Sequence, residues 1–153
     1  MNNSKEITTK ELLIKATKYC AYQERAASEV RQKLVLLGAN SYQIEQVIDE
    51  LYSMSFINEE RYAKVITSGK FRLKNWGKIK IKAYLKAKQI PQHIINSALD
   101  EIPDNEYLDT LSKLIKKKSA SLRETDFLMR KKKLINFLLQ RGFEYNLIND
   151  LLE

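Results

Sequence analysis

Apolar residues recur at intervals of three and four along almost the whole chain, and no segment alternates apolar with polar residues over any length. The first spacing marks one face of an α-helix, whereas a half-buried strand requires alternation. Four glycines and two prolines interrupt the pattern. The sequence therefore predicts an all-α fold of about nine helices, at residues 9–23, 26–37, 41–54, 58–74, 76–89, 91–101, 104–118, 125–140 and 144–152.

A repeat of about 50 residues lies within this helical pattern. Apolar residues recur in register at four positions of the stretches 30–51, 81–102 and 134–153: Val30, Ile81 and Leu134; Leu34, Leu85 and Leu138; Ile44, Ile95 and Ile148; Ile48, Leu99 and Leu152. Gly38 and Gly142 coincide just past a helix, where a left-handed residue is common, and Gln89 takes that place in the middle copy. Any two amphipathic helix pairs can be aligned in part, but agreement in three copies favours a true repeat.

The repeat predicts three tandem three-helix units, at residues 1–55, 56–103 and 104–153, each with a small core of its own. Units of this kind contact mainly their neighbours along the chain. We therefore expect an elongated, curved array with long surfaces and few deep pockets, and we expect it to be monomeric.

Composition excludes several classes of protein. No apolar run approaches the ~18 residues of a membrane span, and the first residues lack the apolar region of a signal peptide. We therefore expect a cytoplasmic protein without a membrane partner. Cys20 and His93 are the single residues of their kinds, so neither an internal disulfide nor a Cys/His metal site can form. Cys20 is best explained as a small buried hydrophobe. The chain shows no nucleophile beside a base, no converging carboxylates and no phosphate-binding glycine loop, so we expect no enzyme, catalytic residue or cofactor.

The net charge of +8 is distributed unevenly. Ten of the 27 Lys and Arg residues fall between Arg61 and Leu99, and this stretch contains no Asp or Glu. Neighbouring cations repel one another, so a basic stretch without acids indicates an anionic partner, for which phosphate is the natural group. Alternatively, these cations only face solvent on the surface of a helix and bind no partner. The basic runs 116–118 and 130–133 have acids near them and are expected to be auxiliary patches.

The basic stretch is expected to combine cations with aromatic rings. In the helix 58–74, the spacing predicts a core face that holds Tyr62, Val65, Ile66, Gly69 and Leu73. Phe71 is expected on the opposite, charged side, near Lys64 and Lys74. In the helix 76–89, the expected core residues are Ile81, Tyr84 and Leu85. The lysines at 78, 82 and 86 would form a basic ridge about 12 Å long.

Trp76, between these two helices, either contacts a base or a protein partner or closes the core between the helices. Nine residues are thus candidates for contact with a partner or with DNA, namely Arg61, Lys70, Phe71, Arg72, Lys74, Trp76, Lys78, Lys82 and Lys86.

The segment 56–90, FINEERYAKVITSGKFRLKNWGKIKIKAYLKAKQI, resembles the central signature of the RecX family of recombination regulators. The run Arg61-Tyr62-Ala63, the helix-leading Gly77 and the pair Leu85-Lys86 match that signature, and the resemblance extends over nearly the whole chain. Asn58 stands where the family usually has Asp, and Gln89 stands where it usually has Gly. Asn is also a competent N-cap, so the first departure is mild.

The resemblance implies a partner that composition alone does not name. Proteins of this family are tandem helical repeats that bind the RecA recombinase, above all its filament on single-stranded DNA, in the filament's helical groove. They limit filament growth, ATP hydrolysis and strand exchange, and they have no known catalytic site. The alternatives are a basic helical module that binds DNA on its own and a helical scaffold whose cations are only solvated.

Overall fold

The computed structural model describes residues 6–153, which form nine helices and no strand. The bounds are α1 Thr9–Tyr22, α2 Ala27–Leu36, α3 Ser41–Ser53, α4 Glu59–Lys74, α5 Lys78–Ala87, α6 Gln92–Asp100, α7 Asp104–Ser121, α8 Phe127–Gln140 and α9 Tyr145–Leu152. The all-α prediction is confirmed, and each expected helix is present with small shifts at its ends. Residues 1–5 of the expected first unit lie outside the described residues.

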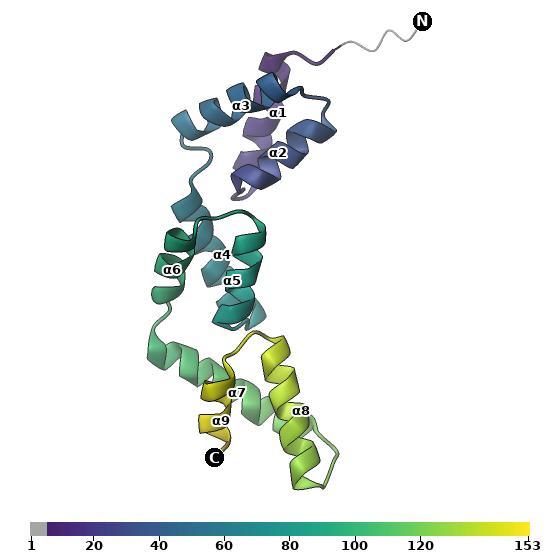
Figure 1. Cartoon of the computed structure of the whole chain (residues 1–153), viewed down its shortest axis with the longest axis vertical. Coiled ribbons are helices and arrows are strands. Elements are labelled where there is room, and N and C mark those ends of the chain that lie inside the picture. Colours follow the sequence, from purple (N-terminus) through teal and green to yellow (C-terminus); the bar gives the residue numbers. More distant parts are fainter. Residues whose placement is uncertain (1–5) are drawn as a thin grey trace, which may run out of the picture.

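The helices form three groups that follow one another along an extended molecule (Figure 1). Each group contains three consecutive helices, α1–α3, α4–α6 and α7–α9, and we call these groups the first, middle and third units. The array bows gently, with the second helix of each unit (α2, α5, α8) towards the inside of the bow and the third helix (α3, α6, α9) towards its outer side. In residues 6–153, every helix is too short or too polar to cross a membrane.

The turn between the second and third helices has the same backbone form in every unit. Gly38, Gln89 and Gly142 have φ angles of 91°, 64° and 94°, so all three residues are left-handed. Glycine adopts this conformation without strain, whereas Gln89 adopts it with a side chain. The equivalence of Gln89 with the two glycines, expected from the repeat, is confirmed.

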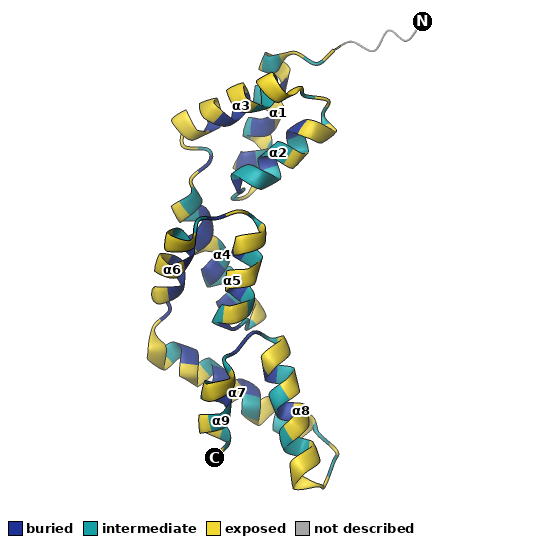
Figure 2. Ribbon diagram, viewed as in Figure 1, coloured by how far each residue is buried: buried dark blue, intermediate teal, exposed yellow. Residues whose placement is uncertain are grey.

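Buried residues occur in all three units (Figure 2). Within the described residues they form two hydrophobic clusters. One cluster belongs to the first unit, with Val30 and Leu34 fully buried. The other runs without a break through the middle and third units and includes Ile81, Leu85 and Leu138. The expectation of a separate core for each unit is therefore wrong for the last two. The reason is that rings of the middle and third units pack directly against one another at their junction.

The junction between the middle and third units brings two backbones into contact. The N–H of Gly77 donates to the carbonyl of Arg141 at 2.7 Å, and the N–H of Ile79 donates to the carbonyl of Gly142 at 3.0 Å. A Cβ on Gly77 would lie 2.3 Å from the carbonyl carbon of Gly142, which is far too close for two atoms that are not bonded to each other. Glycine at both positions thus permits α5 to begin directly on the α8–α9 turn.

A related contact joins the first unit to the middle one. Ser28, in the first turn of α2, donates its hydroxyl hydrogen to the carbonyl of Lys88, which precedes the left-handed Gln89, at 2.8 Å. Nearby, Ala26 is fully buried within the cluster of the middle and third units. The start of each second helix in the first two units therefore docks on the left-handed turn of the next unit.

Candidate functional site

The buried face of α4 differs from the expected one, which moves Phe71 out of the candidate site. Phe71 is 1% exposed and belongs to the core, whereas Leu73 is 82% exposed and Val65 is 50% exposed. Thr67 and Ala63, four and eight residues before Phe71, are buried on the same side as the ring. The placement of Phe71 among the charges is wrong because small and polar residues, and not the large aliphatic ones, line this face of α4.

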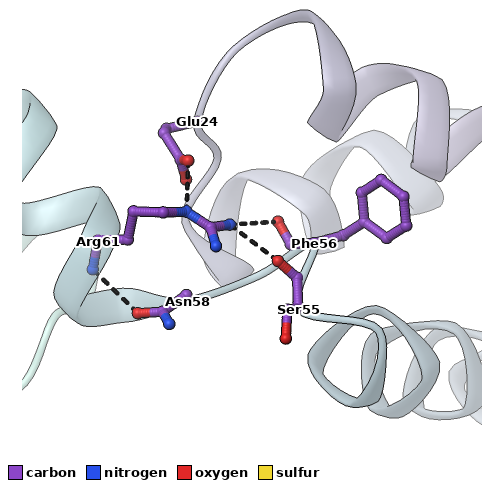
Figure 3. Close-up of polar contacts among 5 residues, drawn as sticks. All are labelled: Glu24, Ser55, Phe56, Asn58 and Arg61. Atoms are coloured by element: carbon purple, nitrogen blue, oxygen red, sulfur yellow. Dashed lines mark hydrogen bonds and ion pairs between the residues drawn. The ribbon is translucent and has the colours of Figure 1, made fainter.

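Arg61 and Arg72 are engaged in contacts within the protein. Arg61 pairs with Glu24 and donates to the carbonyls of Ser55 at 2.9 Å and Phe56 at 3.4 Å (Figure 3). These three partners belong to the first unit and to its connection with α4. Arg72, near the end of α4, pairs with Glu106 of α7 at 3.2 Å. Both arginines therefore hold neighbouring units together and have less capacity to bind an outside anion.

Trp76 lies half-buried against the core, with its ring edge-on to Tyr84 at a centroid separation of 5.8 Å. The Lys70 and Lys80 ammonium groups lie 4.7 and 4.4 Å from the centroid of the Trp76 ring. A cation over an aromatic face is attracted by the ring quadrupole. This position fits a residue that closes the core between α4 and α5 and fixes two lysines at the surface.

The three lysines of the expected α5 ridge have different surroundings. The Lys78 side chain is half-buried, and its ammonium lies 5.0 Å from the ring centroid of Tyr107. Lys82 and Lys86 are exposed one turn apart, and Lys74 is exposed at the end of α4. No ion pair within residues 6–153 involves Lys74, Lys82 or Lys86. The ridge available to a partner therefore consists of Lys82 and Lys86, and we call this pair the α5 ridge.

Charge is divided between the helices according to their place in the repeat. The third helices, α3, α6 and α9, contain no Lys or Arg, whereas every first and second helix contains at least two. Because α5 lies towards the inside of the bow and α6 towards its outer side, the middle unit presents one of its two cationic helices inwards and its cation-free helix outwards (Figure 1). The molecule thus has one side suited to an anionic surface.

The buried titratable groups serve packing. Burial is the main cause that raises the pKa of the Cys20 thiol, so the neutral thiol is favoured, as expected for a buried hydrophobe. Burial also raises the pKa of Tyr107, with Glu144 adding to the shift, and keeps its hydroxyl neutral.

Two groups of cations that lie at aromatic rings were not predicted from the sequence. Lys80 was not among the candidates, although it faces Trp76. Arg141 belonged to neither of the basic runs expected in the third unit, although its guanidinium and the Lys118 ammonium both lie at the ring of Phe137. Of these residues, the sequence marked only Lys118, as part of the basic run 116–118. Its proximity to Phe137 and Arg141 was not predictable, because residues about 20 positions apart share no local sequence pattern.

Three family models match the chain in the order of its units. The first, second and third three-helix domains of RecX match residues 14–51, 58–99 and 104–152. Together they cover most of the chain. The chain belongs to the RecX family. Relatives that carry the name Regulatory protein RecX support this, so a regulatory role is the broad function of the family.

The relatives differ in length from this chain. The RecX of Acinetobacter baylyi is 33% identical over 126 residues, which is 82% of this chain and 76% of the relative. The RecX of Bacillus cytotoxicus is 30% identical over 140 residues, which is 92% of this chain but 52% of the relative. The chain thus spans about half the length of the Bacillus relative.

A solved structure shares the whole architecture. The crystal structure of RecX from Lactobacillus salivarius matches with a TM-score of 0.84 and 25% sequence identity, over 94% of both chains. The tandem three-unit arrangement is therefore that of the RecX fold.

Proposed function

We propose that this chain regulates homologous recombination by binding the filament that the RecA recombinase forms on single-stranded DNA. The protein lies in the helical groove of the filament and limits filament growth, ATP hydrolysis and strand exchange. It acts in the cytoplasm as a monomer and by occupancy, without catalysing a reaction. Membership of the RecX family and its regulatory name support this role.

The observation that carries the proposal is the separation of charge across the bow. The inner helix α5 carries Lys82 and Lys86, exposed and without ion pairs among the described residues, while the outer helix α6 carries no Lys or Arg. A nucleoprotein groove lined by phosphates attracts such a face, because each contact releases counterions from the nucleic acid. An extended array also presents its charges over a length that matches a polymer better than a small ligand.

Inhibition of ATP hydrolysis tests this role of the α5 ridge. Wild-type protein should lower the steady-state rate of ATP hydrolysis by RecA on single-stranded DNA. The Lys82→Glu/Lys86→Glu variant should need at least about 10-fold more protein for half inhibition, since it replaces two attractions by two repulsions. Circular dichroism should be unchanged, because both side chains are exposed.

The matched control is Lys15→Glu/Lys18→Glu, which makes the same change of net charge on exposed positions of α1. It should inhibit nearly as well as the wild type. Equal inhibition by the ridge variant and this control would show that the α5 ridge does not contact the filament. Unchanged ATP hydrolysis with wild-type protein would remove the proposed inhibition itself.

A further inference from the structure

The third unit carries a groove that is separate from the α5 ridge. Two adjoining hollows of about 190 and 290 Å³ lie between the last turns of α7 and the facing side of α8. Lys118 and Phe137 line both hollows, which therefore form one open groove. Asn75, at the end of α4, borders the first hollow. We call this feature the α7–α8 groove.

Cations from two helices converge on the α7–α8 groove. Lys117, Lys118 and Arg141 line it together with Lys133, and no Asp or Glu of the described chain lines either hollow. Lys133 is paired with Glu124, whereas the other three cations make no ion pair within residues 6–153. The three unpaired cations repel one another, so a bound anion would stabilise this arrangement.

Two of these cations are held in position by an aromatic ring. The Lys118 ammonium lies 4.8 Å and the Arg141 guanidinium 5.2 Å from the centroid of the Phe137 ring. Arg141 also donates from Nη1 to the carbonyl of Lys74 at 2.8 Å, which leaves its other N–H groups available. The Lys118 and Arg141 side chains are thus ordered before an anion binds, so binding costs less side-chain entropy.

The floor of the groove is apolar. Leu114 is buried, and Leu122 and Phe137 are half-buried among the lining residues. Each hollow is smaller than the ~300–1,000 Å³ of a pocket that encloses a small molecule. An open groove with a cationic rim and an apolar floor suits a chain that passes along it and presents both negative charges and flat apolar faces. Single-stranded nucleic acid has this combination of phosphates and bases.

We propose that the α7–α8 groove is a binding site for single-stranded nucleic acid. Phosphates contact Lys117, Lys118 and Arg141, and a base lies against the apolar floor beside Phe137. A double helix fits less well, because its bases are stacked inside and cannot reach the floor. The site needs no recombinase, so the inference stands apart from the proposed function. The bond between Arg141 and the carbonyl of Lys74 also joins the groove to the end of α4, so a strand that leaves it meets Lys74 of the middle unit.

Binding of a fluorescently labelled oligothymidylate, followed by anisotropy at low salt without recombinase, tests the site. Lys117→Glu/Lys118→Glu should weaken binding at least about 10-fold, and the log–log salt dependence should be shallower by about 1.4, which is two contacts at 0.7 each. Lys15→Glu/Lys18→Glu makes the same change of net charge on α1 and should alter affinity much less. Circular dichroism shows whether each variant is folded, and the milder Lys117→Ala/Lys118→Ala should weaken binding in the same direction.

Four results would overturn the inference. They are no binding by the wild-type protein at low salt, equal weakening in the groove variant and the α1 control, equal affinity for duplex DNA of the same length, and equal displacement of the oligonucleotide by polyglutamate. The last result would assign the groove to an acidic polypeptide. None of them bears on inhibition of ATP hydrolysis through the α5 ridge, so a failure here is distinguishable from a failure of the proposed function.

Discussion

Tyr107 joins three helices through one side chain. Its hydroxyl accepts a hydrogen bond from the backbone N–H of Lys78 at 2.9 Å and donates one to Oε1 of Glu144 at 2.8 Å. Its ring lies 5.8 Å from that of Phe71 and 5.2 Å from that of Phe143, measured between centroids. Tyr107 thereby fixes the starts of α5 and α9 against α7, and it explains why the middle and third units share a core.

Replacing Tyr107 by Phe keeps the ring and removes both hydrogen bonds. The free energy of unfolding should fall by about 1–3 kcal/mol, because the N–H of Lys78 and the carboxylate of Glu144 lose a partner in a partly buried place. Urea unfolding followed by circular dichroism measures this. The control Tyr145→Phe, at a position that is 56% exposed, should change stability by less than about 0.5 kcal/mol. Equal losses in the two variants would contradict the role given to the hydroxyl of Tyr107.

The same variant has a signature at alkaline pH. The raised pKa of Tyr107 means that its neutral hydroxyl contributes stability that is complete below the unfolded value of about 10. That contribution is lost as the pH rises from there towards the folded pKa, because unfolding then releases a proton. Between about pH 9 and pH 11, stability should therefore fall less steeply in Tyr107→Phe than in the wild type.

At the scale of the helix, the pattern of apolar residues predicted where helices form but not always which side is buried. In α4, Leu73 and Phe71 are two residues apart and project in nearly opposite directions, so only one of them can face the core. The sequence favours Leu73 because Val65 and Ile66 lie on its side. The structure buries Phe71 because Tyr107 of the third unit packs against its ring, and Phe143 packs in turn against Tyr107. Which face of α4 is buried therefore depends on contacts with another unit, and the local sequence pattern of α4 does not predict those contacts.

The connection from α7 to α8 depends on one arginine. Arg130 donates to the carbonyls of Ser119 at 2.8 Å, Leu122 at 3.1 Å and Glu124 at 2.9 Å. These carbonyls belong to the end of α7 and the chain that follows it, where no further turn supplies N–H donors. The donors of a planar guanidinium lie on three nitrogens, so Arg130 reaches carbonyls that lie too far apart for the single nitrogen of a lysine.

Arg130→Lys should therefore loosen this connection while the charge is kept. Backbone amides in the last turn of α7 should exchange hydrogen with solvent faster, and amides in α4 should not change. The neighbouring exposed substitution Arg123→Lys is the control, and no hydrogen bond of the Arg123 side chain occurs within the described residues. Exchange rates that are the same in wild type and Arg130→Lys would show that the three carbonyl contacts do not hold α7.

At the scale of the whole molecule, the two junctions differ in strength. The middle and third units share one apolar cluster, whereas the first unit keeps its own and is tied on largely by polar contacts, those of Arg61 with Glu24, Ser55 and Phe56 among them (Figure 3). The three-unit order and the buried repeat positions were predictable, because each unit repeats one local pattern. The strength of each junction was not predictable. In the sequence Arg61 belongs to a basic stretch, and its partner Glu24 is 37 residues away.

Arg61→Ala should release the first unit from the rest. Glu24 would remain half-buried without its cation, which costs about 1–3 kcal/mol, and the cost falls on the junction. Thermal unfolding should become broader or separate into two steps, because cooperativity between the units is lost. The control Arg31→Ala removes the pair with Glu45 inside the first unit and should leave the units cooperative. A single sharp transition in Arg61→Ala, as in the wild type, would contradict this description of the junction.

The proposed role depends first on whether the protein binds the recombinase filament at all. Co-sedimentation with RecA filaments that are assembled on single-stranded DNA with a slowly hydrolysed ATP analogue measures this without reference to any one residue. The protein should pellet with the filament in saturable amounts, and much less with the same DNA or with RecA alone. If it stays in the supernatant at low salt while the filaments pellet, it does not act in the filament groove.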